Sequence, residues 1–251
     1  MEIFNNQFNL QIQQAIASYE TKSNVLFQYL EEKSKAGWTK LQFLLYRDNY
    51  FFRTYETIEC VAKVIISAKR HEDFITLRSA GNNCYEESGS NIDRKSHPEL
   101  LLYSHNRHSE RIFGIQGISL RDSLNSPNVL AETKELRKIQ YALYESLNHI
   151  EVLAANYAQE AAATAMLAIF MKSFFEPYRS YYSNKEYREI TEYFHCHLDG
   201  LEERHADEAK YCLFQQCKTF KDIETAIATI NKLLAAQSTM WIALKEKLQS
   251  I

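Results

Sequence analysis

Side chains that can bind a metal are concentrated in residues 193–209, YFHCHLDGLEERHADEA. The stretch holds three histidines and five carboxylates within seventeen residues of otherwise helical character. Glu202 and His205 are three residues apart and would share a helix face, as in the Glu-x-x-His unit of carboxylate-bridged di-metal bundles. His197, eight positions before His205, falls close to the same face. Glu202 and His205 alone are more typical of a solvated helix, so a metal site needs ligands from distant segments.

Two other segments offer such ligands. Glu86 and Glu87 precede the loop-like stretch 88–98, and His97 stands at its exit, where a proline-initiated helix is expected. A carboxylate that ends one helix and a histidine that starts the next can converge on one metal. Glu160 stands alone in an apolar helical stretch, where an unpaired carboxylate is expensive to bury. We therefore expect Glu160 to hold a cation.

The donor types indicate which metal would bind. Three histidines and three carboxylates form a mixed nitrogen and oxygen set that suits iron or manganese, whereas a thiolate-rich set would suggest zinc or copper(I). The five cysteines include no C-x-x-C pair and indicate neither a disulfide framework nor a zinc knuckle. Cys60, Cys212 and Cys217 are expected in the core, and Cys196 is expected to pack rather than to bind metal.

Composition limits the fold and the partners. Only 6 Gly and 3 Pro occur in 251 residues, which favours helix, so we expect an all-α protein with a single domain over residues 1–251. The net charge of -3 without a basic stripe argues against nucleic acid as the main partner. No apolar run is long enough to span a membrane and no secretory leader is evident, so we expect a cytoplasmic protein.

The hydrophobic pattern predicts a series of helices. Two short helices are expected over 6–36, one long helix over 39–70, and another over 71–85. Irregular structure is expected over 107–127. Further helices are expected over 129–146 and 147–175, the latter carrying Glu160, with His149 and Glu151 at the surface near its start. One long helix is expected over 185–216, and a covering helix over 220–249.

Four segments together resemble the haem-oxygenase-like non-haem diiron oxidases and oxygenases, relatives of thiaminase-like and pyrroloquinoline-quinone-synthase-like helical proteins. Residues 38–58, WTKLQFLLYRDNYFFRTYETI, resemble the aromatic early helix of that family. Residues 83–101, NCYEESGSNIDRKSHPELL, resemble its Asn-x-x-x-Glu-x-Gly and His-Pro ligand segment. NYAQEAAATA resembles the segment with the lone mid-helix glutamate, and YFHCH resembles the start of the last ligand segment.

The resemblance implies a ligand set for two iron ions: Glu87, His97, Glu160, His197, Glu202 and His205. Glu160 would bridge the two ions and take part in catalysis. Relative to the family spacing, one extra residue separates His197 from Glu202, and we expect a π-bulge to accommodate it. An alternative register uses His195, Asp199 and Glu202 without a bulge, and Glu86 is a lesser alternative to Glu87.

The resemblance also implies an activity. Two Fe(II) ions would activate O2 for the N-oxidation, C–C cleavage or rearrangement to a nitrile of a small amine or amino acid. The aromatic stripe suggests an aromatic substrate such as tryptophan, in a pocket formed by Phe43, Tyr46, Tyr50 and Arg53, with Arg53 meeting its carboxylate. The alternatives are a metal-free helical interaction protein and a thiaminase-like hydrolase with a cysteine nucleophile. The exact substrate, a homodimer and the choice between iron and manganese stay open.

Overall fold

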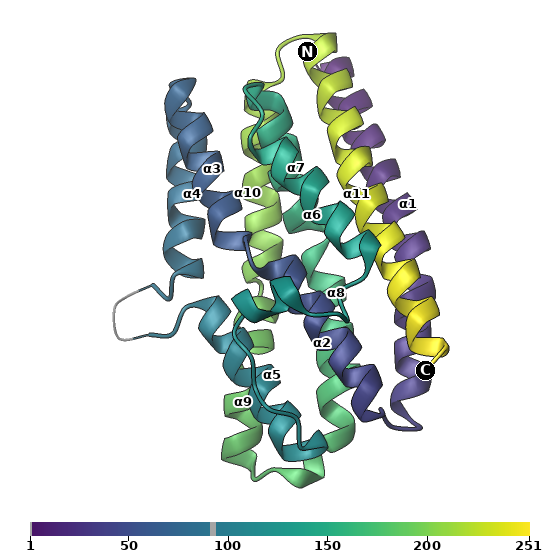
Figure 1. Ribbon diagram of the computed structural model, residues 1–251. Helices are drawn as coiled ribbons and strands as arrows, with labels where there is room; N and C mark the ends of the chain where they lie inside the picture. Colours follow the sequence, from purple (N-terminus) through teal and green to yellow (C-terminus); the bar gives the residue numbers. More distant parts are fainter. Residues whose placement is uncertain (1, 91–93) are drawn as a thin grey trace.

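The computed structural model describes residues 2–90 and 94–251, and every regular element within them is helical, which confirms the all-α prediction (Figure 1). The α-helices are α1 Glu2–Ser34, α2 Lys40–Thr54, α3 Thr57–Arg70, α4 Phe74–Glu87, α5 His97–Phe113, α6 Ala131–Tyr144, α7 His149–Ala161, α8 Ala163–Phe170, α9 Asn184–Leu198, α10 Leu201–Gln216 and α11 Phe220–Gln249. Short 3₁₀ segments occupy Arg121–Asn125 and Glu176–Tyr181, and a π-helix occupies Met171–Phe175.

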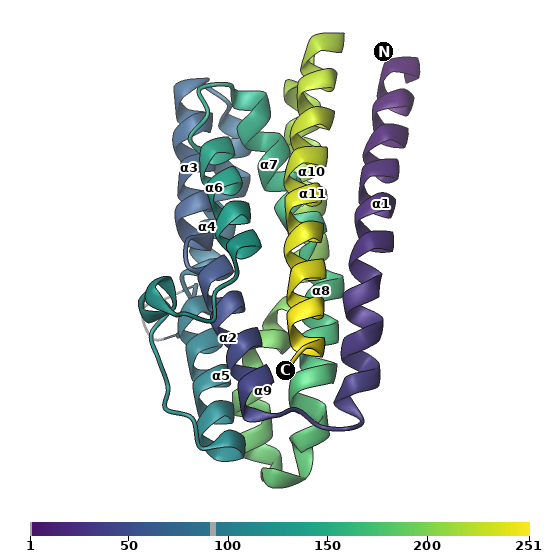
Figure 2. The same ribbon diagram turned by 45° about the vertical axis from the view of Figure 1, so that its right-hand side comes forward.

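The two longest helices form one side of the bundle. The purple α1 and the yellow α11 run alongside each other in both views, with N at the top and C at the lower end of α11 (Figures 1 and 2). On its other side α11 packs against α6 and α7, and α7 packs in turn against α10. Helices α3 and α4 pair with each other, as do α5 and α9. Apolar side chains from α1 to α11 form one continuous buried cluster.

Local capping explains where several helices begin. Thr39, Ser96, Ser183 and Thr219 each form a capping box, in which the side chain accepts from the third helical N–H while that residue's side chain accepts from the cap N–H. Ser96 thereby sets the start of α5 at His97. Residues 91–93 of the loop expected over 88–98 lie outside the described part of the chain.

Three expected helices differ from the observed ones. One helix, α1, ending at Ser34, replaces the two helices expected over 6–36. Thr21 is accommodated within it because its hydroxyl donates to the carbonyl of Ala17 one turn earlier. The helix expected over 39–70 is broken between α2 and α3. Glu56 lies at this break and forms an ion pair with Arg137. The Arg137 guanidinium also lies over the aromatic ring of Tyr55. The helix expected over 147–175 is divided into α7, α8 and the π-helix.

The helix expected over 185–216 is also divided, and the π-bulge expected between His197 and Glu202 is wrong. Helix α9 ends at Leu198, and Gly200 adopts the left-handed conformation with φ of +87° before α10 begins at Leu201. Glycine reaches this conformation without the steric cost that other residues bear. The extra residue is therefore accommodated by a complete break. The helix over 220–249 is confirmed as α11.

None of the helices in the described ranges is both long and apolar enough to cross a membrane. Cys60, Cys212 and Cys217 are buried, as expected for core cysteines. His149, in contrast, is not at the surface: it is buried, its Nδ1 lies 2.8 Å from the Ser67 hydroxyl, and its Nε2 lies 3.1 Å from a carboxylate oxygen of Asp73. This network joins α3, α7 and the start of α4, and it explains why a histidine is accommodated there.

Candidate metal centre

The six residues expected to bind metal all lie at or near helix ends that meet inside the bundle. Glu87 is the last residue of α4 and His97 is the first of α5. Glu160 lies one residue before the end of α7, and His197 one residue before the end of α9. Glu202 and His205 lie in the first turns of α10. All six side chains are buried, with at most 9% of the residue exposed.

Gly89 brings Glu87 and His97 together. It adopts φ of +99°, and a Cβ atom built on it would lie 2.6 Å from the carbonyl oxygen of Arg94. Only glycine allows this close approach of the two ends of the loop. His97 Nδ1 consequently lies 2.9 Å from Glu87 Oε1. The Glu-x-Gly part of the sequence motif thus has a steric cause.

The first group of candidate ligands is Glu87, His197 and Glu202, whose ligand atoms lie within 4.8 Å of one another. His197 Nε2 is 4.0 Å from Glu87 Oε1 and 3.7 Å from Glu202 Oε1. The second group is Glu160, Glu202 and His205, with His205 Nδ1 3.9 Å from Glu160 Oε2. Glu202 belongs to both groups, whereas Glu160 belongs to one. Glu202, and not the Glu160 that the resemblance implies as the bridge, is therefore the carboxylate that the two groups have in common.

Hydrogen bonds fix which nitrogen of two histidines is free to bind a cation. His197 Nδ1 donates to the carbonyl oxygen of Tyr193 at 2.5 Å, so in the neutral ring the lone pair is on Nε2, the atom that faces Glu87 and Glu202. His205 Nε2 donates to Glu86 Oε2 at 2.7 Å. Its Nδ1 then carries the lone pair, and this atom is buried with no hydrogen-bond partner among the described residues. Carboxylates and carbonyls orient metal-binding histidines in this way in many proteins.

Burial and mutual repulsion make the carboxylates hard to ionise without a cation. Burial, followed by the charge of Glu87, raises the pKa of Glu160 to about 8, against a hydrogen bond from Asn83 that lowers it. Burial and the charges of Glu160 and Glu87 raise the pKa of Glu202 well above its ordinary value. A divalent cation would replace the protons that these groups otherwise keep.

The pKa values of Glu87, His97 and His197 are also shifted from their ordinary values. Burial would raise the pKa of Glu87, but the hydrogen bond and charge of His97 outweigh it and lower the pKa. Burial would lower the pKa of His97, but hydrogen bonds with Cys196 and Glu87 outweigh it and raise the pKa to about 10. Burial and the charge of His97 lower the pKa of His197 to about 4, which keeps this ring neutral and able to bind metal.

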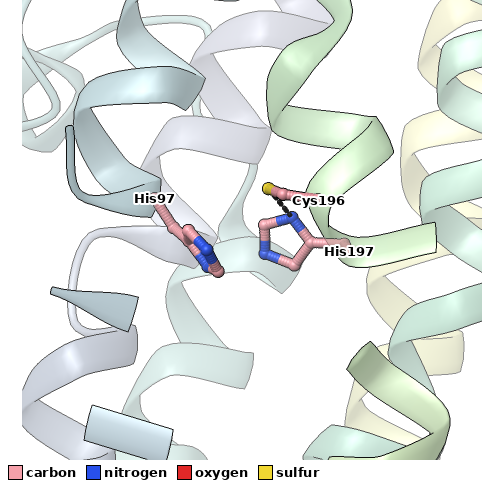
Figure 3. Close-up of side chains that lie close together, drawn as sticks. All are labelled: His97, Cys196 and His197. Carbon is pink, nitrogen blue, oxygen red and sulfur yellow. Dashed lines mark hydrogen bonds between the residues drawn. The ribbon is translucent and has the colours of Figure 1, made fainter. Parts of the chain in front are cut away.

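Cys196 lies beside the cluster but not within it. Figure 3 shows its sulfur next to one nitrogen of His197, with the ring of His97 facing that of His197. The sulfur is 3.3 Å from His197 Nδ1 and 3.1 Å from the carbonyl oxygen of Tyr193. It therefore approaches the nitrogen of His197 that is already engaged, whereas the carboxylates face Nε2. This placement agrees with packing rather than with membership of the carboxylate site, although His97, Cys196 and His197 have ligand atoms within 4.8 Å.

The alternative register is not supported. His195 and Asp199 are exposed and line a surface depression with the basic residues Lys185 and Arg188. Glu86 is not in either ligand group; it binds His205 and the guanidinium of Arg204, at 2.7 Å in each case. Glu86 thus orients the His205 imidazole and lies outside both groups.

A cavity of about 60 Å³ adjoins the cluster. Tyr50 and Arg53 line it, as expected for the substrate pocket. Phe43 and Tyr46 do not, because they turn into the core: Phe43 stacks on Phe113, and the Tyr46 hydroxyl lies 2.9 Å from His105 Nε2. Ligand pockets usually exceed about 300 Å³, so an aromatic amino acid such as tryptophan does not fit the cavity in this conformation.

Two residues that begin motifs quoted from the sequence, but were given no role there, contribute to the site. Asn83 donates its amide to Glu160 Oε1 at 2.9 Å, and its position four residues before Glu87 on a helix was the available signal. The Tyr193 hydroxyl lies 2.9 Å from that of Tyr50, and both rings line the cavity. The arrangement as a whole fits two divalent cations: it joins oxygen and imidazole donors, and in the described part of the chain it leaves His205 Nδ1 buried and without a partner.

No family model and no curated protein matches the sequence, but solved structures share its fold. A CADD-like protein of unknown function from Nostoc punctiforme is 19% identical, covers 96% of this chain and 97% of its own, and has a TM-score of 0.73. A TenA homologue from Pseudomonas syringae pv. tomato is 13% identical, with coverages of 95% and 92% and a TM-score of 0.71. A domain of unknown function from Shewanella denitrificans, described as having a haem-oxygenase-like fold, is 17% identical, with coverages of 97% and 93% and a TM-score of 0.63. The chain therefore has the haem-oxygenase-like helical fold that its motifs led us to expect.

Proposed function

We propose that this protein is an iron-dependent oxidoreductase in which two Fe(II) ions activate O2 for the oxidation of a small amine or amino acid. The observation that carries the proposal is the pair of buried groups that share Glu202, one of which contains the unpartnered Nδ1 of His205. A metal-free interaction protein would gain nothing from three buried carboxylates whose mutual repulsion opposes folding.

Each iron would have protein ligands from different helices. Glu87, His197 and Glu202, with His97 next to Glu87, would hold one ion, and Glu160, Glu202 and His205 would hold the other. When bound, the ions would supply the electrons and the binding position for O2. Manganese would suit the same donors, so the metal that supports turnover has to be determined.

The chain's own groups would prepare the site for this reaction. Glu86 and the Tyr193 carbonyl hold the imidazoles of His205 and His197 in the required tautomers. Burial raises the pKa of Tyr50 to about 12, against a hydrogen bond with Tyr193, so its phenol stays protonated at neutral pH. The cavity wall between these polar groups includes Leu101, Met166 and Leu167, apolar side chains that exclude water from the reacting atoms.

The thiaminase-like alternative is less well supported. A nucleophilic cysteine needs a nearby base that takes its proton. Cys196 has two imidazoles beside it. His197 Nδ1 donates its own proton to the Tyr193 carbonyl and is not free to accept another. Burial would lower the pKa of His97, but hydrogen bonds with Cys196 and Glu87 raise it to about 10, so His97 already holds its proton at neutral pH. Cys60, Cys212 and Cys217 are buried, and burial raises the thiol pKa of each.

The test is anaerobic Fe(II) loading followed by measurement of iron per chain and of O2 consumption on exposure to air. We expect two irons per wild-type chain and almost none in Glu202→Gln, because that change removes a ligand from both groups. Glu203→Gln is the matched control, since Glu203 is exposed on the same turn of α10. Wild-type protein that binds no iron, or Glu202→Gln that still binds two, would refute the proposal.

A further inference from the structure

Arg53 is a buried arginine that forms no ion pair with a carboxylate in the described part of the chain. It lies on α2, is 6% exposed, and forms part of the cavity wall. Its Nε and Nη2 atoms are buried and have no hydrogen-bond partner within the described ranges. The guanidinium groups of Arg47, Arg137 and Arg204, by comparison, each pair with a carboxylate. Arg47 and Arg53 are the buried arginines of the described ranges, and Arg53 is the one of the two that has no ion pair.

An unpaired guanidinium in this position is costly for the folded protein. Arginine cannot lose its proton in proteins, so burial does not neutralise it, and an uncompensated buried charge is strongly destabilising. The nearest support is the indole ring of Trp241, whose centroid lies 5.7 Å from Arg53 Cζ. An aromatic ring contacts the face of a guanidinium and leaves its N–H edge available to a planar anion.

The charge of the occupied metal site would add to that of Arg53. Glu87, Glu160 and Glu202 carry at most three negative charges, whereas two divalent ions carry four positive charges. The cavity of the loaded protein would therefore have an excess of positive charge on both the metal side and the α2 side. A ligand with a carboxylate would neutralise this excess, and an amine without one would increase it.

We propose that Arg53 binds the carboxylate of the substrate, and that this substrate is a short aliphatic amino acid or carboxylic acid. The role in catalysis rests on the proposed function; the binding of the carboxylate does not. The cavity of about 60 Å³ limits the size of the ligand, since one water molecule needs roughly 10–15 Å³ of such space. Only a few non-hydrogen atoms fit between Arg53 and the metal ligands.

The experiment is calorimetric titration of acetate, L-alanine and ethylamine into both the metal-free protein and the anaerobic Fe(II)-loaded protein. We expect both carboxylates to bind and ethylamine not to bind. Arg53→Met should weaken carboxylate binding by roughly 10- to 100-fold, the value of a charged hydrogen bond. Arg53→Lys should lose less, because the ammonium keeps the charge without the two-pronged geometry. Iron per chain should be unchanged in both variants.

Two controls separate recognition from a structural role. Arg137→Gln removes an arginine that already pairs with a carboxylate, that of Glu56. The Arg137→Gln protein should bind acetate as tightly as the wild type does. The melting temperature of ligand-free Arg53→Met should equal or exceed that of the wild type, because the change removes an unpaired buried charge. Acetate binding that is absent from both wild-type forms, unchanged in Arg53→Met, or lost together with a large fall in melting temperature would overturn the proposal. Failure to load iron would refute the diiron function, while titration of the metal-free protein still decides the role of Arg53.

Discussion

Replacing Glu160 with glutamine should stabilise the metal-free protein relative to the wild type, and this difference should grow as the pH rises. Its folded-state pKa is about 8, compared with an ordinary value of 4.5. Below pH 4.5 the carboxyl is protonated in both states and has no effect on the free energy of unfolding. Between pH 4.5 and about 8 the unfolded chain loses this proton while the folded chain keeps it, so folding becomes less favourable with rising pH.

The size of this effect follows from the pKa values. Each pKa unit corresponds to about 1.4 kcal/mol, so the gap between 4.5 and about 8 corresponds to at most about 5 kcal/mol. At pH 5 the cost is about 1 kcal/mol and at pH 8 about 4 kcal/mol, by the same linkage. Glutamine carries no charge and can still accept the hydrogen bond from Asn83. Glu160→Gln should therefore gain about 3 kcal/mol over the wild type between these two pH values, which is roughly 6–12 °C in melting temperature for a chain of this size.

The assay is thermal unfolding of chelator-treated wild type, Glu160→Gln and Glu203→Gln at pH 5 and pH 8. Glu203→Gln should follow the wild type at both pH values, because Glu203 is exposed. In the presence of excess Fe(II) the order should reverse, since only proteins that bind iron gain stability from it. A difference between Glu160→Gln and wild type that does not change with pH would show that Glu160 is not held in a raised-pKa environment.

Three further changes test other parts of the site. Glu86→Gln should lower the affinity for the iron at His205 roughly 10- to 100-fold, the usual effect of losing the hydrogen-bond partner of a metal-binding histidine, and should leave the affinity for the other iron unchanged. Anaerobic Fe(II) titration measures both affinities, and an equal loss at the two irons would argue against this role of Glu86. Gly89→Ala should lower iron occupancy and melting temperature, because its Cβ would collide with the Arg94 carbonyl, whereas Gly114→Ala, which meets no atom within 4 Å, should leave iron binding unchanged. Iron binding should release protons and strengthen from pH 6 to pH 8, because Glu160 and Glu202 must ionise; affinity that falls over this range would contradict the assignment.

Residue types and spacing were enough to predict the fold class. Five of the six expected ligand residues fall into the two groups that share Glu202, whereas His97 is grouped with Cys196 and His197 and contacts Glu87. The choice of Glu87 over Glu86 came from its position two residues before Gly89, and the structure places Glu87 inside the cluster and Glu86 behind His205. The lone glutamate in the apolar stretch of α7 was informative for a physical reason, because burying a carboxylate without a partner is costly. The assignment of these residues as iron ligands is a proposal.

Helix breaks and exact neighbours could not be predicted because they depend on tertiary contacts. Nothing in the local sequence marks the break at Tyr55 and Glu56, which is accompanied by the contact with Arg137 from α6. The extra residue before Glu202 was compatible with a bulge or a break, and only the left-handed φ of Gly200 distinguishes them. The aromatic stripe of α2 was expected to line a pocket. Tyr50 and Arg53 of this helix do line the cavity, but Phe43 and Tyr46 pack into the core.

The central claim is that two metal ions share Glu202. Crystals of the anaerobic Fe(II)-loaded protein, measured at the iron absorption edge, test it most directly because anomalous scattering locates iron without assuming any ligand. We predict two anomalous peaks, one between Glu87, His197 and Glu202 and the other between Glu160, Glu202 and His205. A single peak, a pair bridged by Glu160 without Glu202, or iron at His195 and Asp199 would contradict the account.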